Sequence, residues 1–244
     1  MLAIQHGHNE LGTLTELDRI VELLRQRVPD AHIHVDLVQA YGKIPFDLDD
    51  KGVDSVAISA HKFHGPRGMG CLTLSSKARI AALQPGGGQE HGLRGGTESV
   101  AAAVGMAVAA EAALSGLAQS KAQCTELAEM FFAIVAARLP KLQLLGHPQR
   151  RLPHLLSLRL GGIVAQSLQE RMDARGVAFS TGSACHGQND ENHVLAAIGL
   201  DRIAAREVMR ISFSKLNSVE EATRAADLLI EEAETLEAIS ADLD

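Results

Sequence analysis

The sequence is poor in aromatic residues: they make up 3% of its 244 residues, with one Tyr and no Trp. Proteins that bind single-stranded nucleic acid stack bases on such side chains. The chain also lacks a long basic run, and its 23 Lys and Arg against 30 Asp and Glu give a formal net charge of −7. Such a balance disfavours binding to a phosphate backbone. The composition therefore excludes nucleic acid as the expected partner.

Cysteines and long apolar runs are also scarce. Cys71, Cys124 and Cys185 are too far apart for a CxxC zinc site, and their odd number does not fit a disulfide framework. The longest weakly polar run, SVAAAVGMAVAAEAAL, is interrupted by Glu111 and is shorter than the ~20 apolar residues that cross a bilayer. The first residues show no signal-peptide pattern. We expect a cytoplasmic protein without a membrane span, in which a free thiol can persist as a reagent.

The first part of the chain alternates helix and strand signals. Residues 15–28 have apolar side chains at helical spacing, and 31–39, 53–60 and 69–74 are short apolar runs bounded by Gly or Pro. This alternation predicts an α/β fold with a mostly parallel sheet, whose ligand crevice lies at the carboxyl ends of the strands.

The pattern changes after a Gly-rich stretch. Residues 97–139 predict two helices broken near SGLAQS. Further strands are predicted at LQLLG, HLLSLRL and VMRISF, and further helices at AQSLQERMDARG and VEEATRAADLLIEEAETLEAI. We expect a large α/β domain over 1–116 and a smaller α+β domain over 117–244.

Three polar residues at predicted strand ends suit one cofactor. Pyridoxal 5'-phosphate needs an amine for its aldehyde and an acid for its ring nitrogen. Lys62 and Asp36 offer these groups, and Gln39 could bind the phenolic oxygen of the ring. An isolated Asp or Lys is usually a solvated surface charge. The combination favours the cofactor.

The cysteines and histidines each allow a functional and a structural interpretation. Cys185 lies among small residues in FSTGSACHG, where an exposed thiolate could accept sulfur, whereas Cys71 and Cys124 fit the usual inert, buried thiol. His32 and His34 share a face with Asp36 on one predicted strand. A zinc site needs three or four converging ligands, so we expect no metal.

Four motifs in order resemble one family. They are HVDLVQAYGKIPFDL, SAHKFHGPRGMGCL, GGGQEHGLRGGTESV and STGSAC, and together they resemble the cysteine desulfurases of the NifS/IscS type, within the class V aminotransferases. The resemblance implies a pyridoxal-phosphate-dependent transferase of fold type I, like aspartate aminotransferase. It begins partway into the family pattern, so we expect a large domain incomplete at its N-terminus, which a separate N-terminal segment could complete.

The resemblance implies a role for each residue of the cofactor site. Lys62 would hold pyridoxal 5'-phosphate covalently, Asp36 would pair with the ring nitrogen and Gln39 would contact the phenolic oxygen. Ser59 and His61 would hold the phosphate.

It also implies residues for the substrate and for a second subunit. Asn9 matches the asparagine beside the cofactor, and Arg210 matches the arginine that binds the substrate carboxylate. Thr97 matches a threonine that reaches the phosphate of the neighbouring subunit, so a homodimer is implied. His8 stands where the family often has an asparagine.

The implied reaction converts L-cysteine to L-alanine and leaves a persulfide on Cys185. The sulfur would pass to an acceptor or scaffold protein, for iron–sulfur cluster assembly or thiolation. The alternative is a truncated, catalytically impaired homologue that acts as a binding or scaffold partner.

Overall fold

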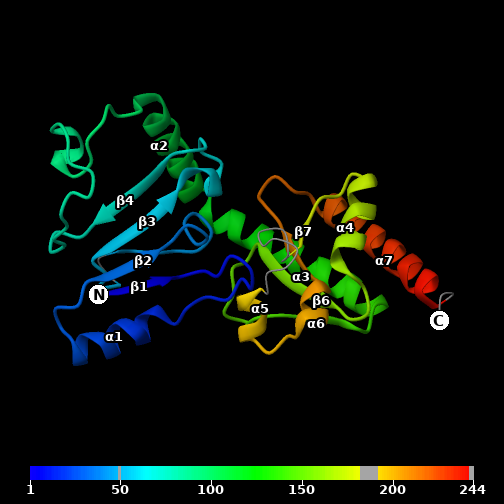
Figure 1. The fold of residues 1–244 in the computed structure, drawn as a ribbon. Helices are drawn as coiled ribbons and strands as arrows, with labels where there is room; N and C mark the ends of the chain where they lie inside the picture. Colours follow the sequence, from blue (N-terminus) through cyan, green and yellow to red (C-terminus); the bar gives the residue numbers. More distant parts are fainter. Residues whose placement is uncertain (49–50, 182–191, 242–244) are drawn as a thin grey trace. The chain divides into compact units, whose positions relative to one another are not determined.

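The computed structural model describes residues 1–48, 51–181 and 192–241 (Figure 1). The chain divides into two compact units. Unit 1 comprises Met1–Gly7 and Thr15–Ala118, and unit 2 comprises His8–Leu14 and Gln119–Asp244. The short segment 8–14 thus packs with the second half of the chain, which no sequence pattern predicts.

Unit 1 contains a four-stranded sheet in the order β1-β2-β3-β4. Strands β1 (Leu2–Gln5), β2 (Ile33–Asp36) and β3 (Ser55–Ser59) run parallel, and β4 (Gly70–Leu74) is antiparallel to β3. The α/β prediction with a mostly parallel sheet is confirmed. Strand β4 reverses because the short connection from β3 cannot make the crossover that a parallel strand needs.

The helices of unit 1 follow the expected pattern. Helix α1 (Leu17–Arg27) precedes β2, and α2 (Val100–Ser115) follows the Gly-rich stretch. A 3-10 turn, η1 (Ala60–Phe63), connects β3 to β4, and a second, η2 (Gln89–Gly92), lies between β4 and α2. Strand β1 is absent from the sequence prediction, because its four residues are too short a run to show a strand pattern.

Strand β4 forms an edge of this sheet, and its side chains are largely exposed. Leu72 is 50% exposed, and Cys71 is exposed as well. The interpretation of Cys71 as a buried thiol is therefore wrong, because no element of the described chain covers this edge strand. Cys124, on helix α3, is buried as expected.

Unit 2 is built on an antiparallel sheet in the order β5-β6-β8-β7. Its strands are β5 (Leu142–Leu144), β6 (Leu155–Leu160), β7 (Ser180–Thr181) and β8 (Val208–Ser212). Its helices are α3 (Leu117–Arg138), α4 (Ala165–Ala174), α5 (His193–Ala197), α6 (Arg202–Arg206) and α7 (Val219–Ala241). The predicted break between α2 and α3 and the other predicted helices and strands of this half are confirmed, whereas β7, α5 and α6 are too short to be predicted from sequence patterns.

The side chains of β8 alternate between two surroundings, as they must in a strand. Met209, Ile211 and Phe213 belong to the main core with α3, α4 and α7. Val208 instead packs with Leu11 of the segment 8–14 in a second, smaller cluster. Arg210 has the parity of Val208 and so lies on the face of the sheet away from the main core.

Helices α4 and α7 are joined by a buried carboxylate, that of Glu232. The carboxylate of Glu232, 7% exposed, accepts hydrogen bonds from Arg171 and Arg175. Burial raises the pKa of Glu232, but the two guanidinium groups outweigh burial and hold the pKa below its usual value. Both arginines are thereby committed to α7.

Among the described residues, no single helix is long and apolar enough to cross a membrane. Helices α2 and α3 meet that test only when they are taken together, and they are bent by 71° at the break between them.

Candidate functional site

The polar residues of unit 1 gather where its parallel strands end. Strands β1, β2 and β3 run in one direction, so their carboxyl ends lie along one edge of the sheet. Asp36 ends β2 and pairs in register with Ala57, two residues before Ser59 ends β3. This edge is the position where open α/β sheets bind ligands.

The turn after β3 presents two side chains outward. Ala60 (0% exposed) and Phe63 (2%) are buried against Met106 of α2. The residues between them, His61 and Lys62, are consequently exposed. The Ser59 hydroxyl lies 2.9 Å from Nδ1 of His61, so these two side chains hold each other.

A close backbone approach keeps this turn tight. A side chain at Gly65 would lie only 3.0 Å from Cβ and from the carbonyl oxygen of Ala60. The Gly65 N–H donates to that same carbonyl over 2.8 Å. A larger residue at this position would therefore force the chain around Ala60 to shift.

Buried residues also fix the turn after β2. Leu37 (2% exposed) and Ala40 (0%) are buried, while Asp36 is exposed and Gln39 is half-buried. The Asp36 carboxylate accepts the Val38 N–H over 2.8 Å. The buried residues and this hydrogen bond fix the start of the turn with the carboxylate facing solvent.

These groups suit pyridoxal 5'-phosphate by their chemistry. The exposed Lys62 amine makes no ion pair within the described residues, so it is available to an aldehyde. Asp36 offers a carboxylate to a protonated ring nitrogen, and the Ser59–His61 pair offers donors to a phosphate. The donor set of unit 1 fits this cofactor.

Two predicted residues meet in unit 2, although they are far apart in the sequence. Arg210 Nη1 donates to the backbone carbonyl of Asn9 over 3.1 Å, and Nη2 donates to the Ser180 hydroxyl over 3.1 Å. Ser180 lies opposite Arg210 in the β7–β8 register. The guanidinium, half-buried on the outer face of β8, is thus oriented by both neighbours while it retains N–H groups for a carboxylate.

The imidazole of His8 shapes the turn that carries Asn9. Nδ1 of His8 accepts the backbone N–H groups of Glu10 (3.1 Å) and Leu11 (3.3 Å). A side-chain oxygen of asparagine makes the same kind of turn, so histidine can replace asparagine here. Burial, the largest cause, lowers the pKa of His8, His193 lowers it further, and Glu10 opposes this shift. The ring is therefore kept neutral, as an acceptor must be.

Thr97 and Cys185 are not brought to either group by the described structure. Thr97 is exposed in the segment before α2 and makes no hydrogen bond with the side chains above within the described part of the chain. Cys185 lies outside the described residues.

The histidines at β2, His32 just before the strand and His34 within it, have a different arrangement from a metal site. His32 Nε2 and His34 Nδ1 lie 2.8 and 2.9 Å from the hydroxyl of buried Ser55. Over the described ranges, no group of three or more His, Cys, Asp or Glu side chains could hold a metal ion.

Comparison with known proteins places the whole arrangement in a family. The model of the class-V aminotransferase family matches residues 1–224. The chain belongs to this family. Among the solved structures, a NifS-like protein superposes with a TM-score of 0.87 and 32% identity, over 96% of this chain and 60% of that one. The predicted fold, fold type I of the pyridoxal-phosphate-dependent transferases, is confirmed.

Curated relatives of this chain are named cysteine desulfurases. IscS of Dictyoglomus turgidum is 34% identical over 98% of this chain and 61% of its own length. NifS of Azotobacter vinelandii is 33% identical over 92% of this chain and 56% of its own length. The structure of SspA in complex with cysteine superposes with a TM-score of 0.70 and 30% identity, over 86% of this chain and 58% of that one. The chain spans about three fifths of the length of the relatives it matches.

Two residues that sequence reasoning misses, Ser180 and His8, orient residues that it predicts. Ser180 holds Arg210 from a strand thirty residues away, and no local pattern signals such a contact. His8 stands out in the sequence only as a departure from the family pattern, yet a polar residue followed by Asn-Glu could have indicated a capped turn.

The neutral acceptor at His8 predicts a pH-dependent stability of the Asn9 turn. The pKa of His8 is lower in the folded chain than in the unfolded chain, where it is about 6.5. Between these two pKa values the unfolded chain binds more protons than the folded chain, so folding stability falls as the pH drops below 6.5. We expect His8→Asn to keep the turn at pH 7.5 and to lose less stability than the wild type at pH 5.5, as measured by urea unfolding.

The variant His8→Ala, which removes the hydrogen-bond acceptor, is the comparison for His8→Asn. It should cost about 1 kcal/mol at pH 7.5, because two backbone N–H groups lose their partner. An identical pH dependence of the wild type and His8→Asn would contradict the assignment.

Proposed function

We propose that the chain is a pyridoxal-phosphate-dependent cysteine desulfurase, which converts L-cysteine to L-alanine with a persulfide on Cys185. The observation that carries the proposal is that the exposed Lys62 amine and the exposed Asp36 carboxylate both follow the carboxyl ends of parallel strands. The chain that carries them belongs to the class-V aminotransferase family. The names of the curated relatives support the choice of L-cysteine as the substrate.

The proposed roles in unit 1 follow from the groups that each turn presents. Asp36 would pair with the ring nitrogen, Gln39 would bind the phenolic oxygen, and Ser59 and His61 would bind the phosphate. Pyridoxal phosphate, when bound, supplies an aldehyde that condenses with amines and a ring that accepts electrons. Lys62 would hold the cofactor and, once released, move the proton at the α-carbon of the substrate.

Substrate binding and sulfur transfer are assigned to residues of the second half of the chain and to Asn9. Arg210, oriented by Ser180 and the Asn9 carbonyl, would bind the substrate carboxylate with its planar guanidinium. The Asn9 side chain would lie beside the cofactor. The Cys185 thiolate would attack the substrate sulfur. The carbon–sulfur bond would break with its electron pair kept by the β-carbon, which takes up a proton, while a sulfur–sulfur bond forms, and alanine would leave. The persulfide would then pass its outer sulfur to an acceptor or scaffold protein.

The first test separates cofactor binding from catalysis. Titration with pyridoxal phosphate should give visible absorbance, and borohydride reduction should leave the cofactor attached to the Lys62 peptide in mass spectrometry. Lys62→Ala should lower alanine release from L-cysteine about 10²–10⁴-fold, and Cys185→Ser should abolish it while cofactor absorbance remains.

Lys77→Ala, at an exposed lysine outside the site, is the matched control and should behave as the wild type. Cofactor binding without alanine release would favour the alternative of a catalytically impaired binding partner. Failure to attach pyridoxal phosphate at Lys62 would contradict the proposal.

We further propose a homodimer that uses one face of α2. Val100, Val104 and Val108 are four residues apart and so share a face of the helix, where they are 68%, 57% and 62% exposed. An exposed apolar stripe of this kind marks an association surface. Thr97 lies three residues before it, which fits the role that the resemblance assigns to a threonine reaching the neighbouring subunit.

Charge on this stripe should separate the subunits. The double variant Val104→Glu, Val108→Glu should sediment as a monomer at concentrations where the wild type sediments as a dimer, because a helix face with two buried carboxylates is disfavoured. Leu23→Glu, at an equally apolar and half-exposed position on α1, should leave the dimer intact. A monomeric wild type, or a double variant that stays dimeric, contradicts the proposed interface.

A further inference from the structure

Unit 2 contains a pocket that the proposed function does not use. Its volume is about 300 Å³, and it lies between α3, the end of α4, the end of β8 and the first turns of α7. This volume is at the lower end of the range of small-molecule sites. All lining residues belong to unit 2.

The floor of the pocket concentrates the scarce aromatic residues of the chain. Phe131, Phe179 and Phe213 line it, and these are three of only six Phe in a chain without Trp. The rings of Phe131 and Phe213 meet edge to face with centroids 5.7 Å apart. Phe131 and Met172 are each 1% exposed. The floor is therefore a fixed apolar surface that suits an aromatic or aliphatic group.

The rim of the pocket carries one carboxylate that is already engaged. Glu221 accepts the Ser218 N–H over 3.1 Å, and its own N–H donates to the Ser218 hydroxyl over 3.2 Å. This pair is a capping box at the start of α7. Asn217 adds a longer hydrogen bond to the same carboxylate, at 3.3 Å. These hydrogen bonds hold the charged Glu221 carboxylate at the start of the helix.

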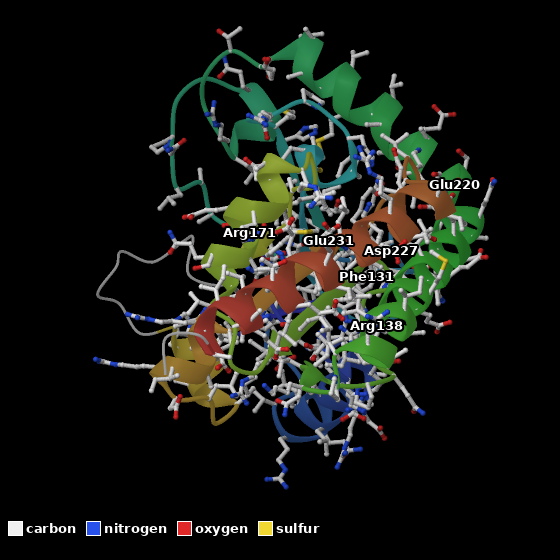
Figure 2. The ribbon with its side chains drawn as sticks, turned by 90° about the vertical axis from the view of Figure 1, so that its right-hand side faces the viewer. Phe131, Arg138, Arg171, Glu220, Asp227 and Glu231 are labelled. Carbon is white, nitrogen blue, oxygen red and sulfur yellow. The ribbon has the colours of Figure 1, made fainter. Side chains whose placement is uncertain are left out.

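The rim also carries a guanidinium, that of exposed Arg224, which makes no ion pair within the described part of the chain. Glu220 and Asp227, both labelled on α7 in Figure 2, lie four residues before and three residues after Arg224 in the sequence, and neither lines the pocket. The nearby arginines of α4 are bound to Glu231 and Glu232. A ligand at the rim therefore meets the guanidinium of Arg224, which has no ion-pair partner in the described part of the chain, beside a carboxylate whose hydrogen bonds hold it to the start of α7.

We propose that this pocket binds a small amphiphilic carboxylate. Its apolar body packs on the three phenylalanines and Met172, and its carboxylate faces Arg224. Burial of the body supplies most of the affinity, and the charge selects an acid over its neutral analogue. The proposal does not depend on pyridoxal phosphate or on the desulfurase reaction.

The test follows the methionine methyl groups of the full chain by NMR. The chain has six Met, so selective ¹³C labelling of the methyl groups gives few signals, and Met172→Leu identifies the one in the pocket. Titration with 4-phenylbutyrate should shift the Met172 signal saturably through the ring current of the probe. The Met209 signal, which comes from a fully buried residue outside the pocket, should stay in place.

The neutral analogue 4-phenylbutanamide and two variants test the assigned contacts. Arg224→Gln should weaken binding of the acid roughly two- to fivefold, as expected for a partly exposed ion pair, and leave binding of the amide unchanged. Arg202→Gln, at an exposed arginine on α6, is the control and should bind as the wild type. Ala225→Leu places a larger side chain in the pocket and should abolish binding of both probes.

Three results would overturn the proposal. They are the absence of a saturable Met172 shift, equal affinity of the wild type for acid and amide, and unchanged binding in Ala225→Leu. If Ala225→Leu lowers the urea midpoint, Ala178→Leu, at an exposed residue of the lining, fills the pocket without touching the core and decides the same question.

Discussion

The packing of Ala60 and Phe63 against Met106 determines which side chains the turn after β3 exposes. A 3-10 turn with two buried ends must direct its middle residues outward, and these are His61 and Lys62. The energy that holds the Lys62 amine in place therefore comes from apolar burial one residue away, because a buried phenylalanine stabilises a fold by several kcal/mol when its loss leaves a cavity. A reactive group can stay solvated because its neighbours fix the backbone.

Strand β8 also fixes the position of a polar group, because its side chains alternate between the two faces of the sheet. Its even-numbered face carries Arg210, oriented by Ser180 and by the Asn9 carbonyl. Its odd-numbered face places Met209 and Ile211 in the main core. A guanidinium gains little from burial unless it is paired, so its position is set by a strand whose other face is held in the core. The segment 8–14 completes this arrangement, because Leu11 packs beside Val208 while Asn9 receives the arginine.

Much of this arrangement can be predicted from the sequence, for physical reasons. Helical spacing and β-branched runs indicate the long helices and most strands, and the carboxyl-end rule alone assigns Asp36 and Ser59 to one edge of the sheet. The strand β1, which pairs with β2, and the pairing of Ser180 with Arg210 depend on contacts over long sequence separations, which local patterns do not encode. The prediction for Cys71 is wrong because a strand's apolar composition does not reveal whether it lies at an edge.

The pocket beside β8 shows that amino-acid composition does not predict whether a chain can form an aromatic binding site. A content of 3% aromatic residues would by itself argue against aromatic ligands, yet three of the phenylalanines converge from α3, from the segment after α4 and from the end of β8. Their convergence follows from the same core that holds β8, since Phe131 and Phe213 belong to it. The core therefore has two consequences on opposite faces of one strand: it supports the position of Arg210, and it leaves an apolar hollow next to the first turn of α7.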